Sequence, residues 1–289
     1  SGIGGNLCYE FCQDDLKVPL NVNKDYFIPN YVNENTLVII SSYSGNTEET
    51  LQAFDEAELK GAKIVCISSG GKVIERAVEK AYDHIIIPGG NPPRACLGYS
   101  LTQQIFTLHK LGLISDKPLD ELRSIPDFLD EHENNIQSLA RDVADDIYDK
   151  MPIIYINANM ESVAVRLRQQ LNENSKILCW HHAIPEMNHN ELVGWRNEDE
   201  NLAVVLFRNQ CDYKKIQQRI EINKTIFEKY TPNILELYSI GENHIQRSMY
   251  LIHLGDWISV FIAELRKMDA VEVNVIDYLK SELNKPYTA

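Results

Sequence analysis

The chain has 289 residues, which suffices for one large or two ordinary domains with a substantial buried core. Its 42 acidic residues outnumber its 28 basic ones and give a formal net charge of −14, which argues against a nucleic acid or an anionic membrane surface as a partner. The sequence holds neither an apolar run of the roughly 20 residues that a membrane helix needs nor a signal-peptide pattern at its start, so we expect a cytosolic protein.

Short apolar runs alternate with helical segments in the first half of the chain. The predicted strands are 37–40, 63–67 and 84–87. The predicted helices are 47–59, 73–81 and 97–111, followed by a polar two-helix stretch from 118 to 150.

The alternation restarts after residue 150. The predicted strands are 152–156, 176–180, 202–207 and 233–237, and the predicted helices are 162–171, 213–230, 244–266 and 273–284. Repeated alternation of strand and helix predicts a parallel sheet with helices on both faces. We therefore expect two doubly wound α/β domains, residues 1–150 and 151–289, with ligands beyond the carboxyl ends of the strands.

The six cysteines occur singly, without a CxxC pair. They are Cys8, Cys12, Cys66, Cys96, Cys179 and Cys211. Several lie in or beside apolar runs, so we expect reduced packing residues rather than metal ligands or disulfide partners.

Hydroxyl side chains crowd the end of the first predicted strand, in the stretch SYSGNTEET at residues 42–50. Asn46 and Glu49 have the spacing of a capping box, which places the start of the next helix near Thr47. The free N–H groups of its first turn and the positive end of its dipole favour an anion, and Ser42 and Ser44 would add neutral donors together with Thr47.

A phosphate monoester fits this donor set, because it offers three acceptor oxygens. The Walker pattern GxxxxGK[ST] is absent, so a nucleoside triphosphate is not indicated. The alternative is that these side chains only form turns and helix caps.

The stretch SYSGNTEET resembles the phosphate loop of the sugar isomerase (SIS) domain, a doubly wound module of phosphosugar isomerases, amidotransferase isomerase domains and sugar-phosphate-sensing regulators. SSGGK at residues 68–72 is similar to that module's second turn. SGIGGN at residues 1–6 resembles the end of the glycine-rich turn that closes the first strand of bifunctional phosphoglucose/phosphomannose isomerases. This likeness implies that Ser1 also faces the phosphate, and that the family's first strand and the helix before it precede residue 1. The alternative origin of Ser1 is a purification scar.

The stretch PEMNHNELVGW at residues 185–195 is very similar to the Pro-Glu-x-x-His-Asn-Glu run of the same family. The resemblance implies that His189 opens the sugar ring. In physical terms, the amides of Asn188 and Asn190 could hold the tautomer of this imidazole, which suits proton transfer near neutral pH. His181 and His182 are adjacent on a predicted strand and point apart, so we expect no metal site there.

Three more positions complete the set that the resemblance implies. Glu173 ends a predicted helix where the family carries its catalytic glutamate, and the negative end of the helix dipole makes its ionisation more costly, as suits a general base. Arg94 matches a Pro-x-Arg segment and would face the developing enediolate. Lys280 matches a lysine of the closing helices near the ring oxygen. Without the resemblance, each would be interpreted as an ordinary surface residue.

Residues 269–272 depart from the family pattern. They are DAVE where the family commonly has Asp-Pro-Thr-Pro. The resemblance associates that threonine with acceptance of the mannose epimer, so the departure puts phosphomannose activity in question.

The sequence thus predicts an aldose–ketose isomerase that interconverts glucose 6-phosphate and fructose 6-phosphate through a cis-enediolate, with mannose 6-phosphate as a further candidate substrate. No metal or organic cofactor is expected, because the substrate's carbonyl acidifies the neighbouring C–H. The resemblance implies a homodimer with His189 contributed across the interface. The alternatives are a non-catalytic sugar-phosphate sensor, which has no use for the catalytic set, and an amidotransferase isomerase domain, which needs a glutaminase half.

Overall fold

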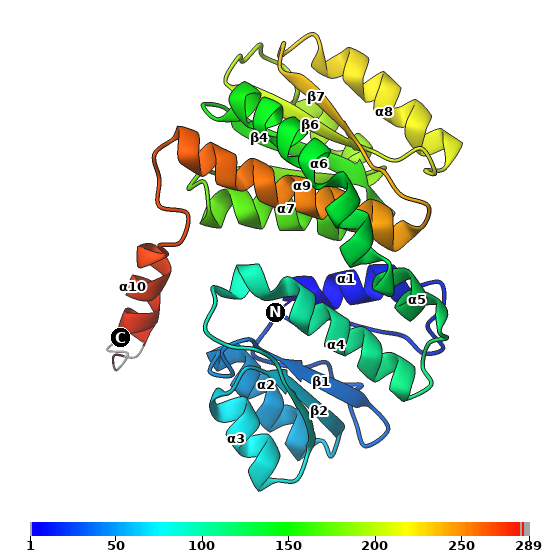
Figure 1. Ribbon diagram of the computed structural model, residues 1–289, viewed down its shortest axis with the longest axis vertical. Helices are drawn as coiled ribbons and strands as arrows, with labels where there is room; N and C mark the ends of the chain where they lie inside the picture. Colours follow the sequence, from blue (N-terminus) through cyan, green and yellow to red (C-terminus); the bar gives the residue numbers. More distant parts are fainter. Residues whose placement is uncertain (1, 284, 286–289) are drawn as a thin grey trace. The chain divides into compact units, whose positions relative to one another are not determined.

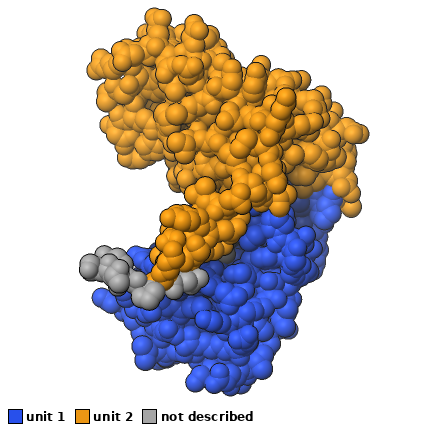
Figure 2. Space-filling view, turned by 90° about the vertical axis from the view of Figure 1, so that its left-hand side faces the viewer, with its two compact units in different colours: residues 1–126, 243–246 blue, residues 127–242, 247–289 orange. Residues whose placement is uncertain are grey.

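The computed structural model describes residues 2–283 and 285, and the chain forms two compact units. Unit 1 comprises the residues up to 126 together with 243–246, and unit 2 comprises residues 127–242 and those from 247 onward (Figures 1 and 2). Within the described residues, none of the helices is both long and apolar enough to cross a membrane.

Unit 1 contains a three-stranded parallel sheet in the order β1-β2-β3. Its elements are α1 (Gly2–Cys12), β1 (Leu37–Ser41), α2 (Glu48–Leu59), β2 (Lys63–Ser68), α3 (Gly71–Glu79), β3 (Asp83–Ile86), the 3-10 turn η1 (Pro93–Cys96), α4 (Leu97–Lys110) and α5 (Lys117–Arg123). The register places Ile40 opposite Cys66, and Ser68 opposite Ile86. The carboxyl ends of all three strands therefore lie at one edge of the sheet.

The two faces of the sheet in unit 1 are covered by different helices. Ile64 and Cys66 of β2 pack with Phe54 of α2 and Val73 of α3 in one buried cluster. Figure 1 shows α2 and α3 side by side on this face, while α4 contacts β2 from the other face and α1 packs on α4. Because successive strand residues point to opposite faces, both faces of β2 are buried, as a doubly wound sheet requires.

Unit 2 contains a four-stranded parallel sheet in the order β5-β4-β6-β7. Its elements are α6 (Ile125–Ile147), β4 (Met151–Asn157), η2 (Ala158–Met160), α7 (Glu161–Glu173), β5 (Trp180–Ile184), η3 (Glu186–His189), η4 (Glu191–Gly194), β6 (Leu202–Arg208), α8 (Lys214–Phe227), β7 (Ile234–Tyr238), α9 (His244–Leu265) and α10 (Asn274–Leu283). Two residues of α6 and the first turn of α9 belong to unit 1.

The sheet of unit 2 is also packed on both faces. Tyr155 of β4 and Leu206 of β6 pack with Ile220 and Phe227 of α8. Figure 1 shows α6, α7 and α9 running side by side, and α7 contacts β4 and β5. Arg166 of α7 forms two hydrogen bonds of 2.9 and 2.8 Å with the carboxylate of Asp256 of α9, which fixes these two helices to each other. The predicted parallel α/β class is confirmed.

The strand predicted at residues 176–180 is wrong, because β5 begins only at Trp180. Lys176 has a left-handed backbone with φ of 56°, and its ammonium group donates to the main-chain oxygens of Glu173 (2.5 Å) and Glu272 (2.9 Å). The carbonyl of Ile177 accepts a hydrogen bond of 2.7 Å from Asn172 of α7. The apolar residues that suggested a strand therefore belong to the connection that leaves α7.

The turn predicted at residues 1–6 is helical in the part that the structure describes, since α1 begins at Gly2. A Cβ on Gly4 would lie 3.1 Å from Nε2 of Gln104 in α4. A Cβ on Gly5 would lie 3.0 Å from Val22. The glycines that suggested a turn thus permit close packing of a helix. Ser1 lies outside the described residues.

The cysteines are free thiols, and four of them are buried: Cys8, Cys12, Cys66 and Cys96. Cys179 is half-buried and Cys211 is exposed. The packing role that we expected from the sequence therefore does not extend to Cys211.

Candidate active site

Three loops meet at the carboxyl edge of the sheet in unit 1, one after each strand. The carbonyl oxygen of Tyr43, in the loop after β1, accepts hydrogen bonds from the N–H (3.0 Å) and hydroxyl (2.6 Å) of Ser69 after β2. The N–H of Val73 donates to the carbonyl of Gly45 (3.1 Å). These three hydrogen bonds hold the hydroxyl-rich loop against the SSGGK turn.

Gly45 and Gly71 make this close approach possible. They have φ of +68° and +67°, a region that residues with a Cβ rarely adopt. A Cβ on Gly45 would lie 1.9 Å from the carbonyl oxygen of Gly70, and one on Gly71 would lie 2.5 Å from that of Ser44. Both positions therefore require glycine for conformation and for space.

The hydroxyls of Ser42 and Thr47 form a pair at the start of α2. Ser42 is buried with 3% exposure, and its Oγ lies 2.9 Å from Oγ1 of Thr47. In such a pair, one hydroxyl donates its O–H to the oxygen of the other. The O–H of the accepting hydroxyl can then donate to a further acceptor. Ser44 is exposed and accepts from the N–H of Asn46 (3.3 Å).

The predicted capping box is wrong, although the helix starts as expected. Thr47 is the N-cap of α2, and within the described residues its side chain makes no capping hydrogen bond. The Asn46 side chain instead bonds to the carbonyl of Ser44 (3.2 Å) and the N–H of Lys72 (3.1 Å). The first backbone bond of α2 runs from Leu51 to Thr47 (3.0 Å). The N–H groups of the first turn of a helix have no partner within the helix, which suits the binding of an anion.

Tyr43 connects the loop after β3 to the hydroxyl-rich loop, a role that the sequence did not reveal. Its phenol oxygen accepts a hydrogen bond of 3.2 Å from the N–H of Asn91, and a side-chain hydrogen bond with Cys96 raises the pKa of Tyr43. The half-buried Arg94 lies between these two contacts, in η1. Unit 1 therefore brings Arg94 and the hydroxyl-rich loop to the same edge of the sheet.

Glu173 is the last residue of α7 and is half-buried. The two residues that follow fix this helix end on α9. Asn174 donates to the hydroxyl of Ser259 (2.9 Å), and Ser175 donates to the main-chain oxygen of Ser259 (2.6 Å). The structure therefore places Glu173 at a rigid helix end, as the sequence indicated.

His189 is exposed at the end of η3. The expected role of its neighbouring amides is wrong, because in the described chain they bond elsewhere. Asn188 donates to Oδ1 of Asn223 (2.7 Å), and Asn190 donates to Glu186 (3.2 Å). These amides hold the backbone of the segment rather than the imidazole ring.

His181 and His182 point to different neighbours, as expected for adjacent strand residues. Nε2 of His181 lies 3.4 Å from a carboxylate oxygen of Glu161, and Nδ1 of His182 lies 2.7 Å from Glu191. Burial, assisted by the charge of Arg168, lowers the pKa of His181. Among the described residues, no group of three or more His, Cys, Asp or Glu side chains could hold a metal ion.

Lys280 is exposed on α10, which buries none of its described residues. The DAVE stretch connects α9 to α10, and Glu272 within it pairs with Lys176 at 3.7 Å. Unit 2 thus carries Glu173, His189 and Lys280 on three different elements, and their cooperation stays a prediction.

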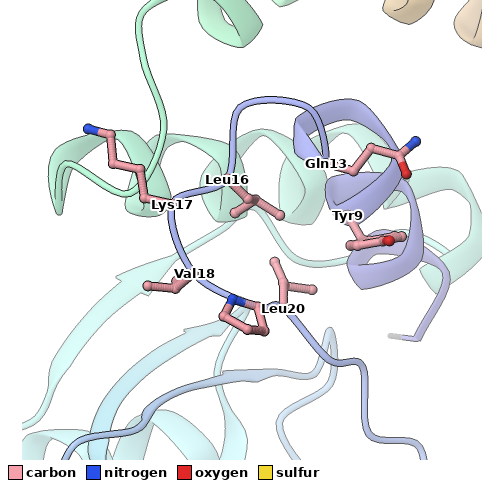
Figure 3. A pocket seen from close by; sticks show the side chains of 7 residues that line it. Tyr9, Gln13, Leu16, Lys17, Val18 and Leu20 are labelled. Atoms are coloured by element: carbon pink, nitrogen blue, oxygen red, sulfur yellow. The ribbon is translucent and has the colours of Figure 1, made fainter.

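A separate surface cavity of about 330 Å³ lies on unit 1 (Figure 3). It is formed by α1 and the chain that follows, and its lining residues are Tyr9, Gln13, Leu16, Lys17, Val18, Pro19 and Leu20. None of the predicted site residues lines this cavity.

Comparison with known proteins identifies the family of the chain. Residues 136–283 match the family described as bacterial phospho-glucose isomerase C-terminal SIS domain. The bifunctional phosphoglucose/phosphomannose isomerase of Caldicellulosiruptor bescii is 39% identical over 98% of this chain and 86% of its own length. The Aquifex aeolicus protein of the same name is 37% identical over 99% of this chain and 88% of its own length.

Among solved structures, the C-terminal domain of glucosamine-fructose-6-phosphate aminotransferase from Francisella tularensis superimposes with a TM-score of 0.76 at 16% identity. The match covers 93% of this chain and 83% of that one. At this identity the likeness shows the fold alone. The family match over residues 136–283, together with the 39% and 37% identity to two relatives across nearly the whole chain, establishes that this chain belongs to the bifunctional phosphoglucose/phosphomannose isomerase family.

Proposed function

We propose that the protein is an aldose–ketose isomerase that interconverts glucose 6-phosphate and fructose 6-phosphate, and that mannose 6-phosphate is a second aldose substrate. The observation that carries the proposal is the hydroxyl-rich loop, in which Ser42 pairs with Thr47 at the start of α2 and the Thr47 side chain makes no capping hydrogen bond within the described residues. The names of the relatives support the substrate pair.

In the proposed site, Ser42, Ser44 and Thr47 hold the phosphate together with the N–H groups of the first turn of α2. Ser1, which lies outside the described residues, is a further proposed phosphate contact. The dianionic phosphate is the part of the substrate that this loop would bind most strongly, because charge-assisted hydrogen bonds are stronger than neutral ones.

The proposed chemistry moves protons only. His189, assisted by Lys280, moves the proton of the O1 hydroxyl to the ring oxygen as the bond between C1 and the ring oxygen breaks, which leaves the C1 aldehyde. Glu173 then removes the proton from C2 of the aldose to give a cis-enediolate and returns it to C1, while the hydroxyl proton of O2 passes to O1. Arg94 lowers the energy of the enediolate through its positive charge.

The proposal includes a homodimer in which the partner contributes His189 to the site. The exposure of this histidine on a firmly held segment is compatible with contact to a second copy. A closed two-fold dimer would give two equivalent sites.

The test is a coupled assay of the full-length protein with glucose 6-phosphate, fructose 6-phosphate and mannose 6-phosphate. We expect turnover of glucose 6-phosphate and fructose 6-phosphate and competitive inhibition by inorganic phosphate. Binding of sugar phosphate without turnover would instead support the non-catalytic sensor. Absence of turnover with mannose 6-phosphate alone would refute the second substrate and leave the glucose 6-phosphate isomerase.

A further inference from the structure

We propose that Glu191 is a positioning residue that fixes the segment 185–195, and with it His189, on the sheet of unit 2. This inference rests on the proposed function for the role of His189 and on hydrogen bonds within unit 2 for the role of Glu191. The sequence alone indicated no role for Glu191, although this residue belongs to the PEMNHNELVGW stretch.

The Glu191 carboxylate accepts three hydrogen bonds from two neighbouring strands. Its Oε1 accepts from the phenol of Tyr155 in β4 (2.5 Å) and from the indole of Trp180 in β5 (3.1 Å). Its Oε2 lies 2.7 Å from Nδ1 of His182 in β5. One carboxylate therefore joins the turn after His189 to two strands of the sheet.

Tyr155 makes this attachment rigid. The side chain is fully buried, and its ring stacks on Phe227 of α8 with centroids 5.1 Å apart. Its hydroxyl also accepts from the indole of Trp195 (3.1 Å), at the end of the same segment. Burial, followed by the effect of the Glu191 carboxylate, raises the pKa of Tyr155, so the phenol stays protonated and donates.

The other side of His189 is fixed independently. Met187 is fully buried, and Asn188 donates to Asn223 (2.7 Å), which itself has only 2% exposure. His189 thus lies between two anchored residues while its own ring is exposed. Loss of the Glu191 anchor would free one side of the segment, and small misplacements of a catalytic group reduce turnover strongly.

The chain offers a matched control in Glu133, a second carboxylate of unit 2 that also binds a histidine, an indole and a third donor. It lies in α6 and accepts from His253 (2.6 Å) and Trp257 (3.1 Å) of α9 and from Gln137 of α6 (2.5 Å), and none of these residues has a proposed catalytic role. Glu191→Ala and Glu133→Ala should destabilise unit 2 to a comparable degree, whereas only Glu191→Ala should alter catalysis.

The kinetic test measures kcat and the inhibition constant of inorganic phosphate in both variants. Glu191→Ala should lower kcat about 10-fold to 100-fold and leave phosphate inhibition within about twofold of the parent. Glu133→Ala should keep kcat within about twofold. The kcat of Glu191→Gln should lie between those of the parent and Glu191→Ala, because its amide oxygen can still accept a hydrogen bond from Tyr155. Glu191→Gln replaces Glu191→Ala in the test if Glu191→Ala does not fold. Parental kcat in Glu191→Ala would overturn the proposal.

A double variant separates positioning from general destabilisation. If Glu191 acts through His189, Glu191→Ala should slow the His189→Ala enzyme by less than about twofold. If kcat of the double variant instead falls by the full product of the two single-variant losses, the proposal is contradicted.

A spectroscopic test is independent of turnover. In histidine-labelled protein, the NMR signals of the His189 ring should shift and broaden in Glu191→Ala and stay unchanged in Glu133→Ala. Unchanged His189 signals in Glu191→Ala would overturn the positioning role even if the parent proves inactive. An inactive parent would instead refute the proposed function, so the two failures can be distinguished.

Discussion

Gly45 shows how much of the hydroxyl-rich loop depends on a single residue. The hydroxyl side chains around it were identifiable in the sequence, because they follow an apolar strand and precede a helix. Its contact with the carbonyl of Gly70 was not predictable, since it joins residues that come from different loops. The same reason explains why the role of Tyr43 and the failure of the capping box emerged only from the structure.

Gly45→Ala should disrupt the hydroxyl-rich loop, because a methyl group would clash with the carbonyl of Gly70. We expect the inhibition constant of inorganic phosphate to rise at least about tenfold, since the proposed charge-assisted hydrogen bonds to phosphate depend on this loop. The control is Gly112→Ala, where φ is a similar +70° but a methyl group would meet no described atom within 4 Å. Gly112→Ala should lower the free energy of unfolding by roughly 1 kcal/mol and leave the inhibition constant of phosphate unchanged. Equal inhibition constants for the two variants would contradict the close-contact argument.

Tyr43→Phe tests whether the phenol of Tyr43 positions η1, the 3-10 turn that carries Arg94. The ring would remain, while the hydrogen bonds to Asn91 and Cys96 would be lost. We expect kcat to fall roughly threefold to tenfold, because the two hydrogen bonds that hold the chain around Arg94 would be lost, and phosphate inhibition to stay unchanged. A change in phosphate inhibition with unchanged kcat would contradict this role and would indicate that Tyr43 positions only the hydroxyl-rich loop.

At the level of elements, most strands and helices followed from apolar periodicity. The strand near residue 180 did not, because Ile177 is buried beside a helix end and β5 is an edge strand with two histidines. Periodicity reports burial, and it does not distinguish a buried connection from a strand. The helical start of the chain was missed for a related reason, since its glycines serve helix packing.

Ionic contacts join three elements of unit 2 around Glu236 of β7. Its carboxylate pairs with Arg208 of β6 and Lys224 of α8. Burial alone would raise the pKa of Glu236, but the hydrogen bond from Lys224 and the charge of Arg208 outweigh burial and lower it from its ordinary value of 4.5. A lowered pKa contributes stability that is complete above pH 4.5 and is lost as the pH falls through the lowered pKa.

Glu236→Gln should therefore reduce the free energy of unfolding by about 2 kcal/mol at pH 7, and the difference from the parent should shrink below about pH 4. Tryptophan fluorescence in urea measures this, because Trp180, Trp195 and Trp257 all belong to unit 2. Glu221→Gln is the control, since Glu221 pairs with the same arginine but its side chain is 59% exposed. Its cost should stay below about 1 kcal/mol. An equal loss in both variants at every pH would contradict the assigned role of Glu236.

At the level of the whole molecule, the chain forms two compact units, each with its own parallel sheet. The sequence suggested two such domains from the repeated alternation of elements, with a boundary near residue 150. In the structure the units divide after Pro126, so the long helix α6 groups mainly with unit 2. The apolar face of a helix indicates that it packs, but not which sheet it packs on, and this limits boundary prediction.

A heterodimer experiment tests the proposed exchange of His189 between copies. Chains carrying Glu173→Gln and chains carrying His189→Ala would be co-expressed with different tags, and the mixed dimer would be isolated. Each variant alone should be nearly inactive, while the mixed dimer should regain roughly half of the parental activity, because one of its two sites would be intact. A mixed dimer as inactive as its parents, or a monomeric protein, would contradict the arrangement.

The central claim is that Glu173 transfers the proton between C1 and C2. The most direct measurement is the turnover of fructose 6-phosphate by full-length Glu173→Gln, beside Glu161→Gln at the opposite end of the same helix as a control. We predict that Glu173→Gln lowers kcat about 1,000-fold with unchanged phosphate inhibition, and that Glu161→Gln stays within about twofold of the parent. A Glu173→Gln enzyme as active as the parent would contradict the proposed mechanism.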